Sequence, residues 1–163
     1  MVDKNVFRRK YWRNILFRHC DHPKDSSGER VCALEALNYA RCGVVEDALP
    51  CGARESMPVL MSVNDCSFWK SNKARTTFLK PFVQRFALLG QNPMVERAAN
   101  DAVIRYVKDV VQPPEGDYFY EYIKGTPYHA PWAAEQVIAK MAKGSLAYYK
   151  KHMKRVLEIL TDD

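Results

Sequence analysis

The chain has 163 residues, of which 47% are hydrophobic and 27% charged, and its 25 Lys and Arg outnumber 19 Asp and Glu. A chain of this length buries roughly 70% of the surface that it exposes when unfolded, so it can form a core without disulfides or metal. The composition excludes a disordered chain. There is no long apolar run and no signal-peptide core at residues 1–10, which predicts a cytoplasmic protein with no membrane insertion.

The first part of the chain carries the signals of short helices joined by loops. A basic and aromatic stretch at residues 5–18 is predicted to be helical, and a loop follows at residues 20–27. A second helix is expected to start at Ser27 and to end near Gly43, because a glycine suits the left-handed conformation of a C-terminal cap. Ser56 is the expected N-cap of a short third helix that ends near Asp65.

The next two helices have clearer patterns. Between residues 73 and 89 the apolar side chains share one helical face, and Lys and Gln side chains point the other way. Pro81 removes one backbone donor inside this pattern, so we expect a kink or two short helices there. Asn92 and Pro93 form an N-cap and first-turn pair for a fifth helix, which ends before Pro113.

Residues 112–132 differ in composition from the helical segments before them, because they contain six of the 19 aromatic residues together with several Gly and Pro. We expect a long connection there, or a short strand with turns. A helix from Pro131 to about residue 143 follows. Gly144 and Ser145 are expected to form a break or a new helix cap, and a last helix then runs to about residue 160. The buried stripe of this last helix is predicted to comprise Leu146, Tyr149, Met153, Val156, Leu157 and Leu160.

These elements predict an all-α fold. We expect a single helical domain over residues 1–163, a bundle of roughly six or seven helices with one aromatic-rich long connection. The sequence shows no internal repeat, no low-complexity tract and no linker between domains.

The basic residues are unevenly distributed along the chain. Sixteen of the 25 Lys and Arg lie in three windows that contain no acid, at residues 8–18, 70–85 and 140–155. If these windows converge, they form a positive face able to attract an acidic protein or nucleic acid, and the sequence does not decide between the two. The alternative is an ordinary solvated helix face. The predicted partner-binding residues are Arg8, Arg9, Arg13, Lys73, Lys80, Lys150, Lys151, Lys154 and Arg155.

Two of these windows also contain aromatic side chains, and rings beside Arg and Lys are able to stack on the bases of a nucleic acid. The candidates for stacking are Tyr11, Trp12, Phe17, Tyr148 and His152. The sequence nevertheless contains no recognised nucleic-acid-binding motif, so this signal is nonspecific.

The aromatic stretch offers a different site. Phenolic hydroxyls and rings there are suited to orienting and burying a small ligand, although such clusters more often pack a connection against helices. The predicted pocket residues are Tyr118, Tyr120, Tyr122, Tyr128, His129 and Trp132.

Cysteine, histidine and acidic residues predict no catalytic residue, metal site or cofactor. The five cysteines lack CxxC spacing and are expected to be reduced thiols, and the ligand types at residues 19–22 are not spaced like a zinc site. Cysteine catalysis would need a thiol beside His129 or His152. Glu35, Asn64 and Asp65 form either a buried polar network between helices or a carboxylate pair for acid-base chemistry. No common hydrolase, nucleotide-binding or metalloprotease motif occurs.

Residues 31–89 carry a run of recognisable segments: Val31-Cys-Ala-Leu-Glu-Ala-Leu37, Leu49-Pro-Cys51, Pro58-Val-Leu60, Asn64-Asp65 and Leu79-Lys-Pro-Phe82. This run resembles the central segment of small, uncharacterised helical bacterial proteins. The resemblance implies a helical fold and a bacterial or phage origin, and it brings no assigned activity.

The sequence therefore favours a non-enzymatic cytoplasmic binding or accessory protein that uses its basic helical faces on an acidic protein or a nucleic acid. The alternative is a small enzyme or ligand-binding domain with its pocket near residues 118–132.

Overall fold

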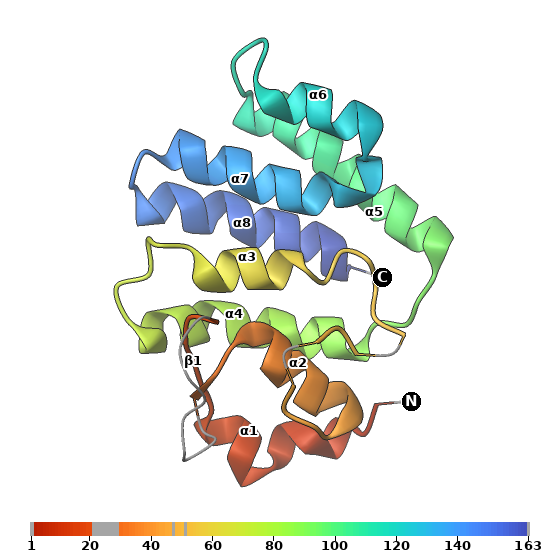
Figure 1. Ribbon diagram of the computed structural model, residues 1–163, viewed down its shortest axis with the longest axis vertical. Helices are drawn as coiled ribbons and strands as arrows, with labels where there is room; N and C mark the ends of the chain where they lie inside the picture. Colours follow the sequence, from red (N-terminus) through yellow and green to blue (C-terminus); the bar gives the residue numbers. More distant parts are fainter. Residues whose placement is uncertain (1, 21–29, 47, 51, 163) are drawn as a thin grey trace. The chain divides into compact units, whose positions relative to one another are not determined.

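The computed structural model describes residues 2–20, 30–46, 48–50 and 52–162, and it confirms the all-α fold (Figure 1). These residues contain eight α-helices, more than the sequence predicted, and one pair of two-residue strands. The elements are η1 (Lys4–Arg8), α1 (Lys10–Asn14), β1 (Leu16–Phe17), β2 (Arg30–Val31), α2 (Ala33–Cys42), α3 (Val59–Asp65), α4 (Asn72–Leu88), α5 (Pro93–Tyr106), η2 (Val107–Val111), α6 (Tyr118–Gly125), η3 (Pro127–His129), α7 (Ala130–Ala142) and α8 (Leu146–Thr161).

The chain divides into two compact units. Unit 1 comprises Met1–Ala53 and Leu60–Gly90, and unit 2 comprises Arg54–Val59 and Gln91–Asp163. Each unit is described by itself below, and the single domain over residues 1–163 stays a prediction. No helix in the described ranges is both long and apolar enough to cross a membrane.

The helix predicted over residues 5–18 is present only in part: η1 and α1 cover the stretch as far as Asn14, and the prediction was wrong beyond it. The helical part ends at Asn14, and the chain then extends through β1, where Phe17 pairs in parallel with Val31 of β2. The Phe17 side chain is fully buried, and its backbone N–H donates to the Thr76 hydroxyl over 2.7 Å. Contacts with distant segments therefore override the local helical preference of this stretch.

The second helix of the chain, α2, has a well-defined cap at each end. The Glu35 carboxylate accepts the Cys32 backbone N–H over 2.7 Å in a capping box, and Gly43 follows the last turn in the left-handed conformation with φ of 77°. The predicted glycine cap is confirmed. Ser27, the predicted start of this helix, lies outside the described residues. The α2 helix packs against α4 in unit 1.

The α4 helix runs unbroken through Pro81, so the predicted division into two short helices does not occur, and the kink stays a prediction. Ser71 caps its first turn, because its hydroxyl accepts the Ala74 backbone N–H over 3.1 Å. Pro81 is on the exposed side of the helix, whereas Leu79 and Phe82 are buried. The missing backbone bond thus falls on the solvent side, and the buried face stays intact.

Unit 2 is built mainly from α5, α7 and α8, which pack against one another, with α6 packed on α7 (Figure 1). The Asn92 side chain accepts the backbone N–H groups of Met94 and Val95, which confirms this predicted cap. In α8 the predicted stripe is buried except for Leu146, which is partly exposed. Ser145 caps the first turn of α8 through the Tyr148 backbone N–H.

The aromatic segment contains α6 and η3 where the sequence predicted a long connection or a strand, so that prediction was wrong. The Asp117 carboxylate accepts the Phe119 backbone N–H over 3.0 Å and starts α6. Its apolar side chains Phe119 and Ile123 lie four residues apart and are both buried. A capping Asp before this helical spacing was a signal in the sequence.

Candidate functional site

Two of the three basic windows meet in unit 1. The Lys80 ammonium donates to the Arg13 carbonyl oxygen over 3.0 Å and lies 5.7 Å from the centre of the Trp12 ring. Burial lowers the pKa of Lys80. A shallow groove of about 400 Å³ follows this junction and is lined by Trp12, Thr76, Thr77, Lys80, Pro81 and Gln84. Arg13 is exposed, so two windows that are 67 residues apart in sequence at Arg13 and Lys80 meet at this groove. Arg8, Arg9 and Lys73 are also exposed in unit 1, and Arg9 forms a surface ion pair with Asp3 over 3.4 Å.

Two arginines of these same windows are structural. Arg18 is buried beside Glu35, and Arg75 is buried and donates to Asn72 Oδ1 over 2.6 Å and to the Phe17 carbonyl over 3.4 Å. Burial lowers the pKa of Arg75, while Asp65 opposes this effect. These two side chains therefore belong to the packing of unit 1 rather than to its basic surface.

The third basic window forms the exposed face of α8 in unit 2. Lys150, Lys151, Lys154 and Arg155 are all exposed on this helix, and we call them the α8 basic face. Glu158 is the acid nearest to two of them, at 3.8 Å from Lys154 and 3.5 Å from Arg155. The α8 helix itself contributes four basic residues and one carboxylate, which favours a positive face.

Lys140, at the other end of the third basic window, forms an ion pair within unit 2. The Lys140 ammonium donates to the Asp117 carboxylate over 2.7 Å. Its hydrogen bond, with that from the Phe119 backbone, holds the pKa of Asp117 below its usual value. Lys140 thus stabilises the start of α6, as an ion pair at a helix N-terminus does.

Most of the aromatic residues expected to stack on bases are not available. Trp12 and Phe17 are buried at 3% and 0% exposure, and His152 is buried at 5%. The His152 Nδ1 atom is 2.8 Å from the Tyr106 hydroxyl, and burial lowers the pKa of His152. Tyr148 packs its ring 4.3 Å from that of His152. These rings pack within their own units. Because Trp12, Phe17 and His152 are buried, their rings are not accessible for stacking on bases.

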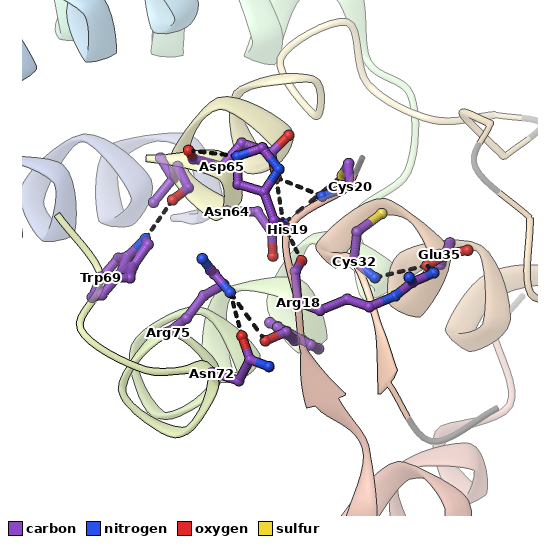
Figure 2. Close-up of polar contacts among 12 residues, drawn as sticks. Arg18, His19, Cys20, Cys32, Glu35, Asn64, Asp65, Trp69, Asn72 and Arg75 are labelled. Carbon is purple, nitrogen blue, oxygen red and sulfur yellow. Dashed lines mark hydrogen bonds and ion pairs between the residues drawn. The ribbon is translucent and has the colours of Figure 1, made fainter. Parts of the chain in front are cut away.

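The polar residues around Arg18 form a buried network in unit 1 (Figure 2). Figure 2 shows the Arg18 side chain reaching toward Glu35, whose carboxylate lies 3.8 Å from the guanidinium. The Asn64 side-chain amide donates to the Arg18 carbonyl oxygen over 2.7 Å. Glu35, Arg18 and Asn64 are each at least 94% buried. The network therefore ties α2 and α3 to the segment that directly follows β1.

Asp65 is not paired with Glu35, because it serves a different part of the network. Its Oδ1 atom accepts the Cys20 backbone N–H over 3.0 Å and the Asn64 amide over 2.8 Å, and it lies 3.9 Å from His19 Nδ1. This geometry favours the structural interpretation of Glu35, Asn64 and Asp65 over an acid-base pair. His22, Asp21 and Cys51 lie outside the described residues, and within the described ranges no three metal-ligating side chains cluster.

Four of the six predicted pocket residues line one hollow of about 260 Å³ in unit 2. They are Tyr122, Tyr128, His129 and Trp132, and we call this hollow the aromatic lobe. The Tyr122 hydroxyl and His129 Nδ1 are hydrogen-bonded at 2.9 Å. Tyr118 and Tyr120 do not line it. Tyr118 is 68% exposed, and the Tyr120 hydroxyl donates to the Pro113 carbonyl oxygen over 3.1 Å.

A second hollow of about 400 Å³ shares the walls Glu55 and Tyr128 with the aromatic lobe, and sequence reasoning missed it. Glu55, Glu96, Asn100 and Asp101 line this hollow, which we call the acidic lobe. A signal was present in the sequence, because Asn100 stands three residues before Val103 on the buried side of α5. A polar residue at an inward position of a helix needs an explanation.

Glu135 and Tyr149 form a buried polar pair between α7 and α8 that the sequence did not suggest. The Tyr149 hydroxyl donates to Glu135 Oε1 over 2.7 Å, and Gln136 donates to Oε2 over the same distance. Burial raises the pKa of Glu135, and these two hydrogen bonds oppose the shift.

The Glu135→Gln variant should be more stable than the wild type at neutral pH. Because the pKa of Glu135 is raised in the folded state, its contribution is most favourable at acid pH and is lost as the pH rises through that folded pKa. Glutamine still accepts the Tyr149 hydroxyl but carries no charge. Urea unfolding of both proteins between about pH 4 and pH 8 measures the effect. If the free energies of unfolding of the two proteins changed in parallel over this pH range, the proposed effect of the Glu135 charge would be contradicted.

No protein-family model, curated protein or solved structure matches this chain. The resemblance of residues 31–89 to small helical bacterial proteins stays a prediction.

Proposed function

We propose that this protein is a non-enzymatic cytoplasmic binding protein whose basic helical faces engage an acidic partner, either a nucleic acid or an acidic protein surface. The observation that carries the proposal is the junction of Lys80 with Arg13, which joins two acid-free windows across the groove beside α4. The α8 basic face supplies a second positive surface in unit 2.

Charge distribution supports this proposal more strongly than net charge does. Apart from the buried Arg75, the α4 helix carries the basic residues Lys73, Lys80 and Arg85 and no acid, and α8 carries four basic residues and one acid. A helix face that only contacts solvent commonly has Glu and Lys four residues apart, because such ion pairs stabilise the helix. Concentrated positive charge attracts polyanions and raises their association rate.

Fluorescence anisotropy of labelled single- and double-stranded DNA and RNA tests the choice of partner. If nucleic acid is the partner, we expect its affinity to fall by about tenfold to a thousandfold between about 50 and 200 mM salt, because each neutralised phosphate releases counterions. The slope gives the number of phosphates contacted. Absence of binding at low salt would leave the acidic protein surface as the proposed partner.

A second candidate function, a ligand-binding domain, is favoured by the two lobes of unit 2. Their volumes of about 260 Å³ and about 400 Å³ suit a small organic molecule. This candidate does not use the basic faces, so the two functions are tested separately.

A further inference from the structure

Lys80 differs from the other lysines in its surroundings. Its side chain is half-buried, whereas every other lysine that the structure describes is exposed. Its nitrogen lies 5.7 Å from the centre of the Trp12 ring and donates to the Arg13 carbonyl oxygen over 3.0 Å. Both contacts come from α1 of unit 1, so they hold the end of this α4 side chain in one place.

The Lys80 side chain is nevertheless accessible to a small molecule, because it lines the groove of about 400 Å³ in unit 1. The described residues that line this groove are Trp12, Thr76, Thr77, Lys80, Pro81 and Gln84, and none of them is an acid. A carboxylate in contact would favour the ammonium form of the lysine. The groove therefore offers access to the amine without pairing it with an acid.

Burial makes the Lys80 nitrogen more reactive. Water stabilises an ammonium better than half-buried surroundings do, and this loss of hydration lowers the pKa of Lys80. A larger share of the side chain is uncharged at neutral pH than for a fully hydrated lysine, and the uncharged amine is the nucleophile. An uncharged amine still has an N–H for the Arg13 carbonyl oxygen, and its lone pair is then available for attack.

The charge near the groove favours an anionic reagent. Arg13 is exposed, and both windows that meet here, residues 8–18 and 70–85, contain no acid. Positive charge concentrates anions close to the amine and repels cations. Acyl phosphates, the mixed anhydrides of a carboxylic acid with phosphate, are anionic and transfer their acyl group to amines.

We propose that Lys80 is a modification site that acyl phosphates acylate directly. The lone pair of the Lys80 nitrogen attacks the acyl carbon and forms a C–N bond. The bond from this carbon to the bridging oxygen breaks, phosphate leaves with the bonding electron pair, and the nitrogen loses a proton to water. The product is an uncharged amide, so the reaction removes one positive charge beside Arg13. This inference goes beyond the proposed function and needs no binding partner.

Isotope labelling of the folded wild-type protein measures the reactivity of each lysine. The protein is treated briefly with acetyl phosphate, unfolded, and then fully acetylated with isotopically heavy acetic anhydride. Trypsin then cleaves after Arg alone, and the peptide of residues 76–85 carries Lys80 as its only lysine. Lys73 is the matched comparison, because it is exposed on the same helix.

Mass spectrometry should find about fivefold or more light label at Lys80 than at Lys73, because the half-buried amine is more often uncharged. Equal or lower labelling of Lys80 would overturn the proposal. In about 8 M urea the burial is lost, and the preference for Lys80 should disappear. A preference that persists in the unfolded chain would contradict a role of the groove.

A neutral reagent tests the proposed reagent class. With the N-hydroxysuccinimide ester of acetic acid, the preference for Lys80 should be smaller, because positive charge no longer concentrates the reagent. An equal or larger preference with the neutral ester would overturn acyl phosphates as the class of reagent.

The Arg13→Gln variant tests the charge beside the groove. It keeps the backbone carbonyl that accepts from Lys80, and it should lower labelling of Lys80 by acetyl phosphate about twofold or more. Arg105→Gln, which removes an exposed cation of unit 2, is the matched control and should leave this labelling unchanged. Equal labelling in both variants, with the fold checked by circular dichroism, would contradict the proposed attraction. None of these measurements uses a nucleic acid or protein partner, so they are independent of the proposed function.

Discussion

Reversal of three charges on the α8 basic face, Lys151→Glu, Lys154→Glu and Arg155→Glu, is expected to weaken nucleic-acid or acidic-protein binding by about a hundredfold or more. Each side chain is exposed, so the change replaces attraction by repulsion without opening the core. The ion pairs of Lys154 and Arg155 with Glu158 are on the surface, and their loss should cost less than about 1 kcal/mol. Thermal unfolding checks this second point.

The control is a second triple variant that changes the net charge by the same amount but at residues outside the three basic windows. Arg105→Glu, Lys108→Glu and Lys124→Glu also reverse three exposed charges of unit 2 but lie outside the three windows. Anisotropy titrations of both triple variants, at one salt concentration, should show the large loss only for the α8 triple. An equal loss of affinity in both triple variants would mean that net charge alone drives binding. An unchanged affinity of the α8 triple variant would contradict a role of the α8 basic face in binding.

The Glu35→Ala variant is expected to lower the free energy of unfolding by about 3–5 kcal/mol, the usual effect of removing one partner of a buried ion pair. The Glu35 carboxylate lies 3.8 Å from the Arg18 guanidinium, and both side chains are about 93% buried or more. The same carboxylate accepts the Cys32 backbone N–H over 2.7 Å at the start of α2. Its loss leaves a buried cation without this carboxylate and removes the helix cap.

Two further variants identify the cause of that loss. Arg18→Met with Glu35→Leu removes both charges and should regain about 1–3 kcal/mol relative to Glu35→Ala. Glu121→Ala removes a carboxylate from an exposed ion pair with Lys124 and should change stability by less than about 1 kcal/mol. Urea unfolding measures all three. The structural role of Glu35 would be refuted by a loss no larger than that of Glu121→Ala.

Local signals in the sequence located most helices and several of their ends. Gly43, Asn92 and Ser145 act as caps where the pattern expected them, because capping depends only on residues within one turn. The stripe of α8 also follows from spacing along a single helix. The predictions of local structure failed where contacts with distant segments decide the backbone conformation. Phe17 lies in a strand rather than a helix because Val31 and Thr76, far along the chain, supply its backbone partners.

The candidate site was only partly visible in the sequence. Residue type pointed to Tyr122, Tyr128 and His129, yet nothing local indicated that Tyr118 and Tyr120 face elsewhere. For the acidic lobe the inward position of Asn100 on α5 was the one local signal, and the sequence could not show which residues surround it, since its walls come from residues 54–59, α5 and η3 of unit 2. The sequence also could not separate structural arginines from surface ones within one basic window.

The all-α class, the three acid-free basic windows and most of the buried stripe of α8 could be derived from the amino-acid sequence, because they depend on residue type and on spacing along one helix. The burial of Arg18 and Arg75, the contact of Lys80 with Arg13 beside Trp12, and the place of Asn100 in a hollow with three carboxylates became visible in the folded structure alone. The physical reason is that burial and hydrogen-bond partners are set by packing between segments far apart in sequence, which no local pattern encodes.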